Sequence, residues 1–249
     1  MEILVLGDSG LLGNTVKSYL EHSGFIVNTI PEKFRWNTPE FKSYIKDNES
    51  DFIVNCIGAI HQRTREFSIN YELPIWLDLN SKSKIIHPGT DCEMDGDDYG
   101  RSKKVARDYI VDYSARTKII KTSIIGIETR SNYSLMSWFL STPENESVNG
   151  FTNQMWNGNT TLTWAKFCKN LIKEWEKYEK ETILHSECIS KYEVLLSINK
   201  VFDRKINIIP LESKNEVNKC LFGGVQTPHI EFQLEEFKNF LLGLNDDKN

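Results

Sequence analysis

The 249-residue sequence predicts an α/β fold built on a mainly parallel sheet with helices on both faces. The first observation is an apolar run at residues 2–6, followed by a glycine-rich turn and a helical pattern that continues to Leu20. The second is that further apolar runs alternate with helical patterns through the first half of the chain. Strand and helix in alternation favour a parallel sheet, because each crossover returns the chain to the same end of the sheet. We therefore expect a Rossmann-like, doubly wound architecture.

The turn after the first strand has the spacing Gly7-x-x-Gly10-x-x-Gly13. Between a strand and a helix, such a turn directs backbone N–H groups and the positive end of the helix dipole toward a pyrophosphate. A purely structural corner is the alternative, but the strand-to-helix context favours nucleotide binding. The cofactor contacts expected in this turn are Gly7, Ser9, Gly10, Leu11, Leu12 and Gly13.

The end of the second strand, expected at residues 25–30, bears on the choice of cofactor. Sites that prefer NAD commonly place an acidic residue there for the ribose 2′-hydroxyl. This chain has Asn28 instead, with Lys33 and Arg35 shortly after. The pattern favours NADPH, with Asn28 and Arg35 as contacts, and leaves NADH possible. Ordinary solvated charges at Lys33 and Arg35 are the alternative explanation.

The rest of the first half is expected as strands at 51–58, 84–87 and 118–122 and helices at 67–79 and 99–114. Pro74 predicts a kink or a late start in the first of these helices. Ligands of open α/β sheets bind at the carboxyl ends of the strands. The further cofactor contacts expected there are Cys56, Ile57, Gly58 and Ser123.

Tyr99 and Lys103 are four residues apart in a predicted helix, nine residues after Thr90. Residues four apart share a helix face, so the ammonium can lie beside the phenol and favour its ionised form. Such a pair also occurs by chance on surface helices. A phenol with a lowered pKa is a suitable proton donor to the alkoxide that hydride transfer leaves on a carbonyl carbon.

Together these motifs resemble the extended short-chain dehydrogenase/reductases. The resemblance rests on the glycine turn, Asn55-Cys56-Ile57-Gly58, Asn70, Gly89-Thr90-Asp91 and Tyr99-Gly100-Arg101-Ser102-Lys103. The Thr-Asp loop and Lys121-Thr122-Ser123-Ile124-Ile125-Gly126 are most similar to the dTDP-4-dehydrorhamnose reductase branch. The likeness covers residues 1–130, which implies a dinucleotide-binding core there and a small C-terminal substrate lobe at 131–249.

The resemblance implies a reductase that uses NADPH or NADH on a nucleotide-linked 4-keto-deoxysugar for surface polysaccharide biosynthesis. Thr90 would hydrogen-bond the ketone, with Asp91 also in the substrate site, and Tyr99 would deliver the proton. Lys103 would lower the pKa of Tyr99 and hold the nicotinamide ribose. A homodimer is also possible for this family.

Two departures leave alternatives open. Cys92, two places after Thr90, resembles the thiol of bifunctional sugar-nucleotide epimerase/reductases such as GDP-fucose synthase, where it moves a proton beside the ketone. An inert buried thiol is the alternative, and residues 131–138 offer no histidine or lysine as its acid–base partner. Glu93 lies one place late for the dehydratase pattern. A non-catalytic NADP-binding regulatory subunit is the other possibility, but the intact Thr90, Tyr99 and Lys103 favour chemistry.

The stretch 149–161 combines aromatic, amide and hydroxyl side chains in a predicted loop before a helix at 162–178. This mixture suits a sugar, whose faces stack on Trp and whose hydroxyls bond to Asn and Thr. A capped turn ahead of the helix is an equal alternative. Further helices are expected at 191–202 and 232–242, and a strand at 206–209. The expected substrate contacts in this half are Ser134, Trp138, Asn153 and Trp156.

Composition excludes several classes of function. A net charge of −5 gives no electrostatic footprint for nucleic acid or an anionic membrane. No apolar stretch reaches membrane-spanning length and no basic segment precedes the first strand, so a cytoplasmic protein is expected. The cysteines are Cys56, Cys92, Cys168, Cys188 and Cys220. Their wide spacing implies neither a disulfide framework nor a zinc site, and most are expected to be buried thiols.

Overall fold

The computed structural model describes residues 1–246, and its internal contacts divide the chain into two compact units. Unit 1 comprises Met1–Lys121 and Ala165–Thr182, and unit 2 comprises Thr122–Trp164 and the chain from Ile183 onward. The division therefore falls earlier than the expected boundary at 130, and one later segment belongs to unit 1. That segment contains the buried Leu171 and Ile172 of an amphipathic helix. The amphipathic pattern predicts that one face of this helix packs against the protein core. It does not predict which of the two units supplies that core.

Unit 1 is built on parallel strands. They are β1 (Glu2–Leu6), β2 (Ile26–Thr29), β3 (Phe52–Asn55), β4 (Lys84–Gly89) and β5 (Thr117–Lys121). Their order is β5-β4-β3-β1-β2, and each neighbouring pair is parallel. β10 (Glu181–His185) follows β5 in the order, and β14 (Val225–Gln226) pairs in parallel with its last residues to complete a seven-stranded sheet.

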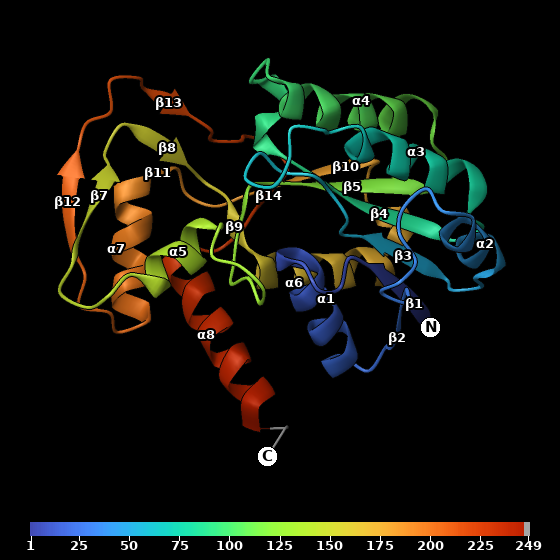
Figure 1. Ribbon diagram of the computed structural model, residues 1–249, viewed down its shortest axis with the longest axis horizontal. Helices are drawn as coiled ribbons and strands as arrows, with labels where there is room; N and C mark the ends of the chain where they lie inside the picture. The colour runs from blue at the N-terminus through green and yellow to red at the C-terminus, as the bar shows by residue number, and fades with distance from the viewer. Residues whose placement is uncertain (247–249) are drawn as a thin grey trace. The chain divides into compact units, whose positions relative to one another are not determined.

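Helices lie on both faces of the unit 1 sheet (Figure 1). The helices are α1 (Leu11–His22), α2 (Pro39–Asp47), α3 (Ile69–Asn80), α4 (Asp98–Tyr113) and α6 (Thr161–Lys173). α3 and α4 pack together on one face, whereas α1 and α6 lie on the other, where Lys169 donates a hydrogen bond to the Tyr19 hydroxyl at 2.8 Å. The Rossmann-like, doubly wound prediction is confirmed.

Two details of unit 1 differ from expectation. α3 starts at Ile69, before Pro74, so a late start forced by the proline is wrong. A proline at the sixth helical position removes only the bond to the carbonyl of residue 70 in the first turn. α2 was not predicted, although Thr38 caps it through the Phe41 N–H and Pro39 is its first residue, which is a typical helix-start signal.

Unit 2 contains short strands around three helices. The strands that lie wholly within it, besides β14, are β6 (Ile124–Ile125), β7 (Ser147–Phe151), β8 (Gln154–Trp156), β9 (Asn159–Thr160), β11 (Ile189–Ser190), β12 (Asn207–Leu211) and β13 (Val217–Asn218). The helices are α5 (Leu135–Ser141), α7 (Lys191–Val201) and α8 (Ile230–Asp246). The expected loop at 149–161 therefore contains strand residues, because β7 and β8 find partners far along the chain, in β12 and in β11 and β13. The expected helix at 162–178 ends as α6 at Lys173, followed by a 3-10 turn, η2 (Trp175–Lys177).

Cys188 and Cys220 form a disulfide with a Cα–Cα distance of 5.8 Å. The expectation that the cysteines imply no disulfide is therefore wrong for this pair. β11 and β13 flank β8 on its two sides, which brings the residue before β11 close to the second residue after β13. Two cysteines 32 residues apart give no sign of this in the sequence. Cys56, Cys92 and Cys168 are free thiols.

Candidate active site

The glycine turn after β1 has the geometry of an anion site. Gly7 adopts a left-handed conformation, and its carbonyl accepts a hydrogen bond from the Gly10 N–H at 3.0 Å. A Cβ at Gly13 would overlap the Gly7 carbonyl oxygen, so only glycine lets α1 pack this closely on the turn. The N-cap residue of α1 is Gly10, which has no side chain to cap the helix. The first N–H groups of this helix therefore suit a phosphate.

The end of β3 lies against this turn. A Cβ on Gly7 would come within 3.0 Å of the Cys56 carbonyl group, which places Cys56 beside the turn. The buried Asn55 accepts from the Ile57 N–H at 3.1 Å, and its amide contacts the His87 ring at 3.2 Å. Burial is the main factor that raises the pKa of the Cys56 thiol, so this residue stays protonated. Its expected role, with Ile57 and Gly58, is as a cofactor contact, and that role stays a prediction.

The residues expected to choose between NADPH and NADH lie at β2 and after it. Asn28 is a half-buried residue of β2, in register with Leu4 of β1. Arg35 is exposed, and its carbonyl accepts the Thr38 hydroxyl at 2.9 Å. Lys33 stacks near the Phe34 ring. The exposed guanidinium of Arg35 suits a 2′-phosphate, and this role also stays a prediction.

Thr90 is the N-cap of a short 3-10 helix, η1 (Asp91–Met94), that begins where β4 ends. Its hydroxyl accepts from the Cys92 N–H at 3.2 Å and donates to the Asp91 carboxylate at 3.1 Å. Glu93 closes a capping box by accepting from the Thr90 N–H. The threonine is buried, so its hydroxyl is held in one place at the carboxyl edge of the sheet.

Tyr99 lies in the first turn of α4, which Asp97 caps through the Gly100 N–H at 2.6 Å. Burial first, and then Cys92 and the carboxylates of Asp91 and Asp97, raise the pKa of Tyr99 above its usual range, and the nearby Thr90 side chain partly offsets this rise. The two predicted catalytic residues therefore lie close together. The expectation that Lys103 lowers the pKa of Tyr99 is therefore wrong for this structure, since the pKa moves in the opposite direction.

The reason lies in the position of Lys103. It is buried on α4, and its ammonium donates to the Pro88 carbonyl of β4 at 2.8 Å. Burial lowers the pKa of Lys103 to about 8, partly offset by the charge of Glu93. An ammonium has three donors. Within residues 1–246 only the Pro88 carbonyl accepts from it, which leaves donors for hydroxyl groups of a ligand.

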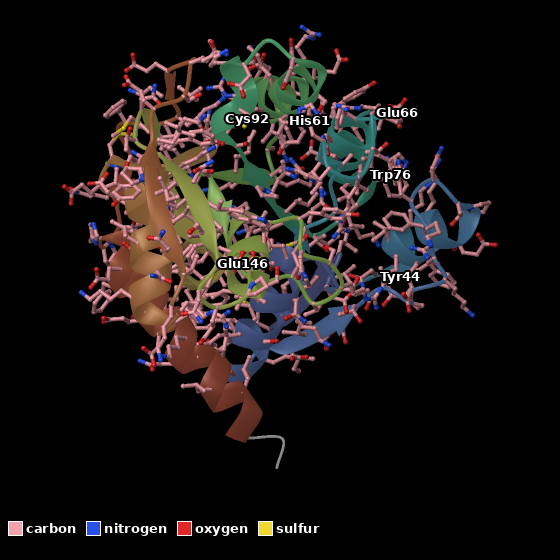
Figure 2. The ribbon with its side chains drawn as sticks, turned by 60° about the vertical axis from the view of Figure 1, so that its left-hand side comes forward. Tyr44, His61, Glu66, Trp76, Cys92 and Glu146 are labelled. Carbon is pink, nitrogen blue, oxygen red and sulfur yellow. A yellow bond between two sulfur atoms is a disulfide. The ribbon has the colours of Figure 1, made fainter. Side chains whose placement is uncertain are left out.

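Two further side chains surround this cluster. The Cys92 thiol donates to the Asp91 carboxylate at 3.4 Å. His61 lies in the segment after β3, with its ring 5.3 Å from that of Tyr99 and its Nε2 3.0 Å from Asp97, and Figure 2 labels both Cys92 and His61. Sequence reasoning missed His61, because nothing in the local pattern after β3 shows where that segment runs. Among residues 1–246, no group of three or more His, Cys, Asp or Glu side chains is arranged to hold a metal ion.

The candidates in unit 2 have different surroundings. Ser134 caps α5 and donates to the Gly126 carbonyl at 3.0 Å, and Ser123 offers its carbonyl to the Asn159 N–H at 2.8 Å. Trp138 is exposed on α5. Asn153 donates to the Ser213 carbonyl at 2.7 Å and accepts from the Ser213 N–H at 2.9 Å.

Trp156 is buried on β8, against the position where a Cβ on Gly158 would lie. Together with the paired amide of Asn153, this gives both residues a structural role within unit 2. Of the four expected substrate contacts, Trp138 presents the most accessible side chain. None of the unit 2 assignments goes beyond a prediction.

Comparison with known proteins supports the fold assignment. No protein-family model and no curated protein sequence matches the chain. Among solved structures, a dTDP-4-dehydrorhamnose reductase from Bacillus anthracis in complex with NADP is 15% identical, with a TM-score of 0.77 over 96% of this chain and 98% of that chain. A GDP-mannoheptose C4 reductase from Campylobacter jejuni with NADP bound is 10% identical, with a TM-score of 0.71 over 97% and 98%.

A UDP-glucose 4-epimerase from Thermotoga maritima with UDP-glucose is 14% identical, with a TM-score of 0.71 over 98% and 99%. The chain therefore has the fold of the extended short-chain dehydrogenase/reductases, as the motifs predicted. Within that fold, it is similar over nearly its whole length to dTDP-4-dehydrorhamnose reductases of several bacteria. No helix within residues 1–246 is long and apolar enough to cross a membrane.

Proposed function

We propose that this chain is a reductase that uses NADPH, or NADH, to reduce the 4-keto group of a nucleotide-linked deoxysugar, as in dTDP-4-dehydrorhamnose reductases. The observation that carries the proposal is the placement of Thr90 at the carboxyl end of β4, with Tyr99 and Lys103 on α4 and the Lys103 ammonium bonded to the Pro88 carbonyl of the same strand. The names of the fold neighbours, which include reductases, epimerases and a dehydratase of sugar nucleotides, support the substrate class.

The residues present fit a dinucleotide. The uncapped start of α1 and the close turn at Gly13 suit its pyrophosphate, and the spare donors of Lys103 suit the ribose hydroxyls. Arg35 would contact the 2′-phosphate of NADPH, with Asn28 nearby. When bound, the cofactor supplies the hydride.

The chain supplies the proton and the orientation of the ketone. Thr90 donates a hydrogen bond to the ketone oxygen in place of its bond to Asp91. Tyr99 donates its proton to the same oxygen as negative charge develops there. Because its raised pKa keeps the phenol protonated near neutral pH, the donor form is fully populated before reaction. General acid catalysis of this kind contributes about 100- to 10,000-fold.

The rest of the proposal concerns the setting of this reaction. Unit 2 would form the substrate lobe, with Trp138 as its accessible aromatic side chain and Ser134 at the same helix start. A homodimer and a cytoplasmic location accompany the proposal as expectations, and a place in surface polysaccharide biosynthesis is the expectation from the family.

The test is to incubate the purified protein with NADPH and a panel of 4-keto sugars linked to dTDP, UDP, GDP and CDP. We expect loss of the NADPH absorbance with at least one of them. If none is reduced while NADPH still binds, the reductase proposal fails and a regulatory binding role takes its place. Running the reaction in deuterated water separates the epimerase alternative, since deuterium at carbons beside the ketone would show proton exchange by Cys92.

A further inference from the structure

Glu93 is a buried carboxylate that the proposed mechanism does not use. It lies in η1 and is 5% exposed. One oxygen, Oε1, faces the backbone N–H of Thr90 at 3.5 Å and closes the capping box of the turn. The other, Oε2, accepts from the Lys121 ammonium at the end of β5 at 2.5 Å. The carboxylate thus ties the Thr90 turn to the neighbouring strand.

A buried carboxylate with one ion-pair partner contributes little to the free energy of folding, because the desolvation penalty opposes the Coulomb attraction. Apolar residues at both positions would give a fold of similar stability. Stability therefore does not explain the pair, and its position beside the candidate site does. In the sequence, Glu93 lies one place late for the dehydratase pattern, so no catalytic role is expected for it.

The electrostatic surroundings point in the same direction. The charge of Glu93 raises the pKa of Lys103 of α4 against the larger effect of burial, and the pKa of the buried His87 of β4 is lowered first by burial and then by the charge of Lys103. Lys121 also approaches Glu181 of β10 at 3.9 Å, and Glu181 is held by Arg107 of α4 at 3.2 Å. Among these groups, Glu93 is the carboxylate that contacts the Thr90 turn and also acts on Lys103.

We propose that Glu93 is a positioning residue of this site, which holds the Thr90 turn in place and supplies the buried negative charge facing Lys103. The proposal rests on the proposed reduction for its catalytic meaning. The effect of the Glu93 charge on the titration of Lys103 can be measured without any substrate. An experiment can therefore refute the role of Glu93 without refuting the proposed reductase function, and the reverse.

The decisive experiment is an NMR titration of isotope-labelled lysine side chains in the full chain, with Lys103 assigned by its loss in Lys103→Gln. In Glu93→Gln, which keeps the shape and removes the charge, the titration midpoint of Lys103 should fall by about one pH unit or more. In Glu93→Asp, which keeps the charge, the midpoint should stay near that of the unchanged chain. A midpoint unmoved in folded Glu93→Gln overturns the proposal.

Glu181→Gln is the matched control, because it also removes a carboxylate beside Lys121 but leaves the Thr90 turn intact. It should move the Lys103 midpoint less than Glu93→Gln does. If Glu93→Gln does not fold, the double variant Glu93→Gln/Lys121→Met removes both buried charges together and is titrated instead. Its Lys103 midpoint should lie below that of Lys121→Met alone, because only the Glu93 charge differs between these two variants.

The pH dependence of kcat/KM is the second test of the role of Glu93. If a sugar is reduced, the limb of the pH profile of kcat/KM that reports Lys103 should move to lower pH in Glu93→Gln and return in Glu93→Asp. A uniform loss of activity with an unmoved profile would indicate a merely structural carboxylate and overturn the proposal. If no sugar is reduced but the midpoint moves, the coupling stands and the proposed function fails.

Discussion

The Thr90 turn of unit 1 and the 149–161 stretch of unit 2 have similar polar compositions but use their polar atoms differently. Beside the turn, Lys103 of α4 keeps donors beyond its bond to Pro88, and the Thr90 hydroxyl donates to the Asp91 carboxylate, a side chain that can exchange partners. In the stretch, both ends of the Asn153 amide bind the backbone of Ser213, and both ends of the Asn157 amide bind the backbone of Leu221. Polar composition alone therefore does not distinguish a ligand site from a loop that braces another loop.

The largest expected effect is on chemistry in unit 1. Tyr99→Phe should lower kcat by about 100- to 10,000-fold, because the proton donor is lost. NADPH affinity and the thermal midpoint should change little, since the ring contacts with His61 and Phe67 remain. Tyr113→Phe, on the exposed end of the same helix, is the control and should behave as the unchanged chain. Retained turnover in Tyr99→Phe would assign proton transfer to another group.

The next effect concerns the disulfide between Cys188 and Cys220 in unit 2. Cys188→Ser should lower the free energy of unfolding by about 2–4 kcal/mol, because opening a disulfide frees the unfolded chain over a 32-residue separation. Calorimetry measures the loss, and reductant should have the same effect on the unchanged chain. The denatured, unreduced chain should present three reactive thiols, from Cys56, Cys92 and Cys168. Five reactive thiols would mean that the disulfide between Cys188 and Cys220 does not form.

The smallest effect tests the comparison most directly. Asn153→Ala should reduce stability by about 1–3 kcal/mol, since it leaves the polar groups of Ser213 unpaired. Asn149→Ala, an exposed position on β7, should stay within about 0.5 kcal/mol. Neither variant should change kcat/KM. A raised KM in Asn153→Ala without a loss of stability would make Asn153 a substrate contact after all.

Local sequence patterns predicted the parallel strands of unit 1 and its glycine turn, although they missed α2. Strand periodicity, the glycine turn and the Tyr99–Lys103 spacing depend on residues close together in the chain, so the pattern that predicts them also builds them. The same reasoning failed for the pKa of Tyr99. That pKa depends on burial and on the carboxylates of Asp91 and Asp97, and spacing along a helix says nothing of either.

The sequence by itself determined the parallel sheet, the close glycine turn before α1 and the position of Thr90 just after β4, since each follows from local geometry at strand ends. Only the tertiary structure decided that Lys103 turns to Pro88, that Glu93 pairs with Lys121 and that Cys188 meets Cys220. These contacts join residues 15, 28 and 32 positions apart. Their partners are chosen by the packing of whole strands and helices, which no local pattern encodes.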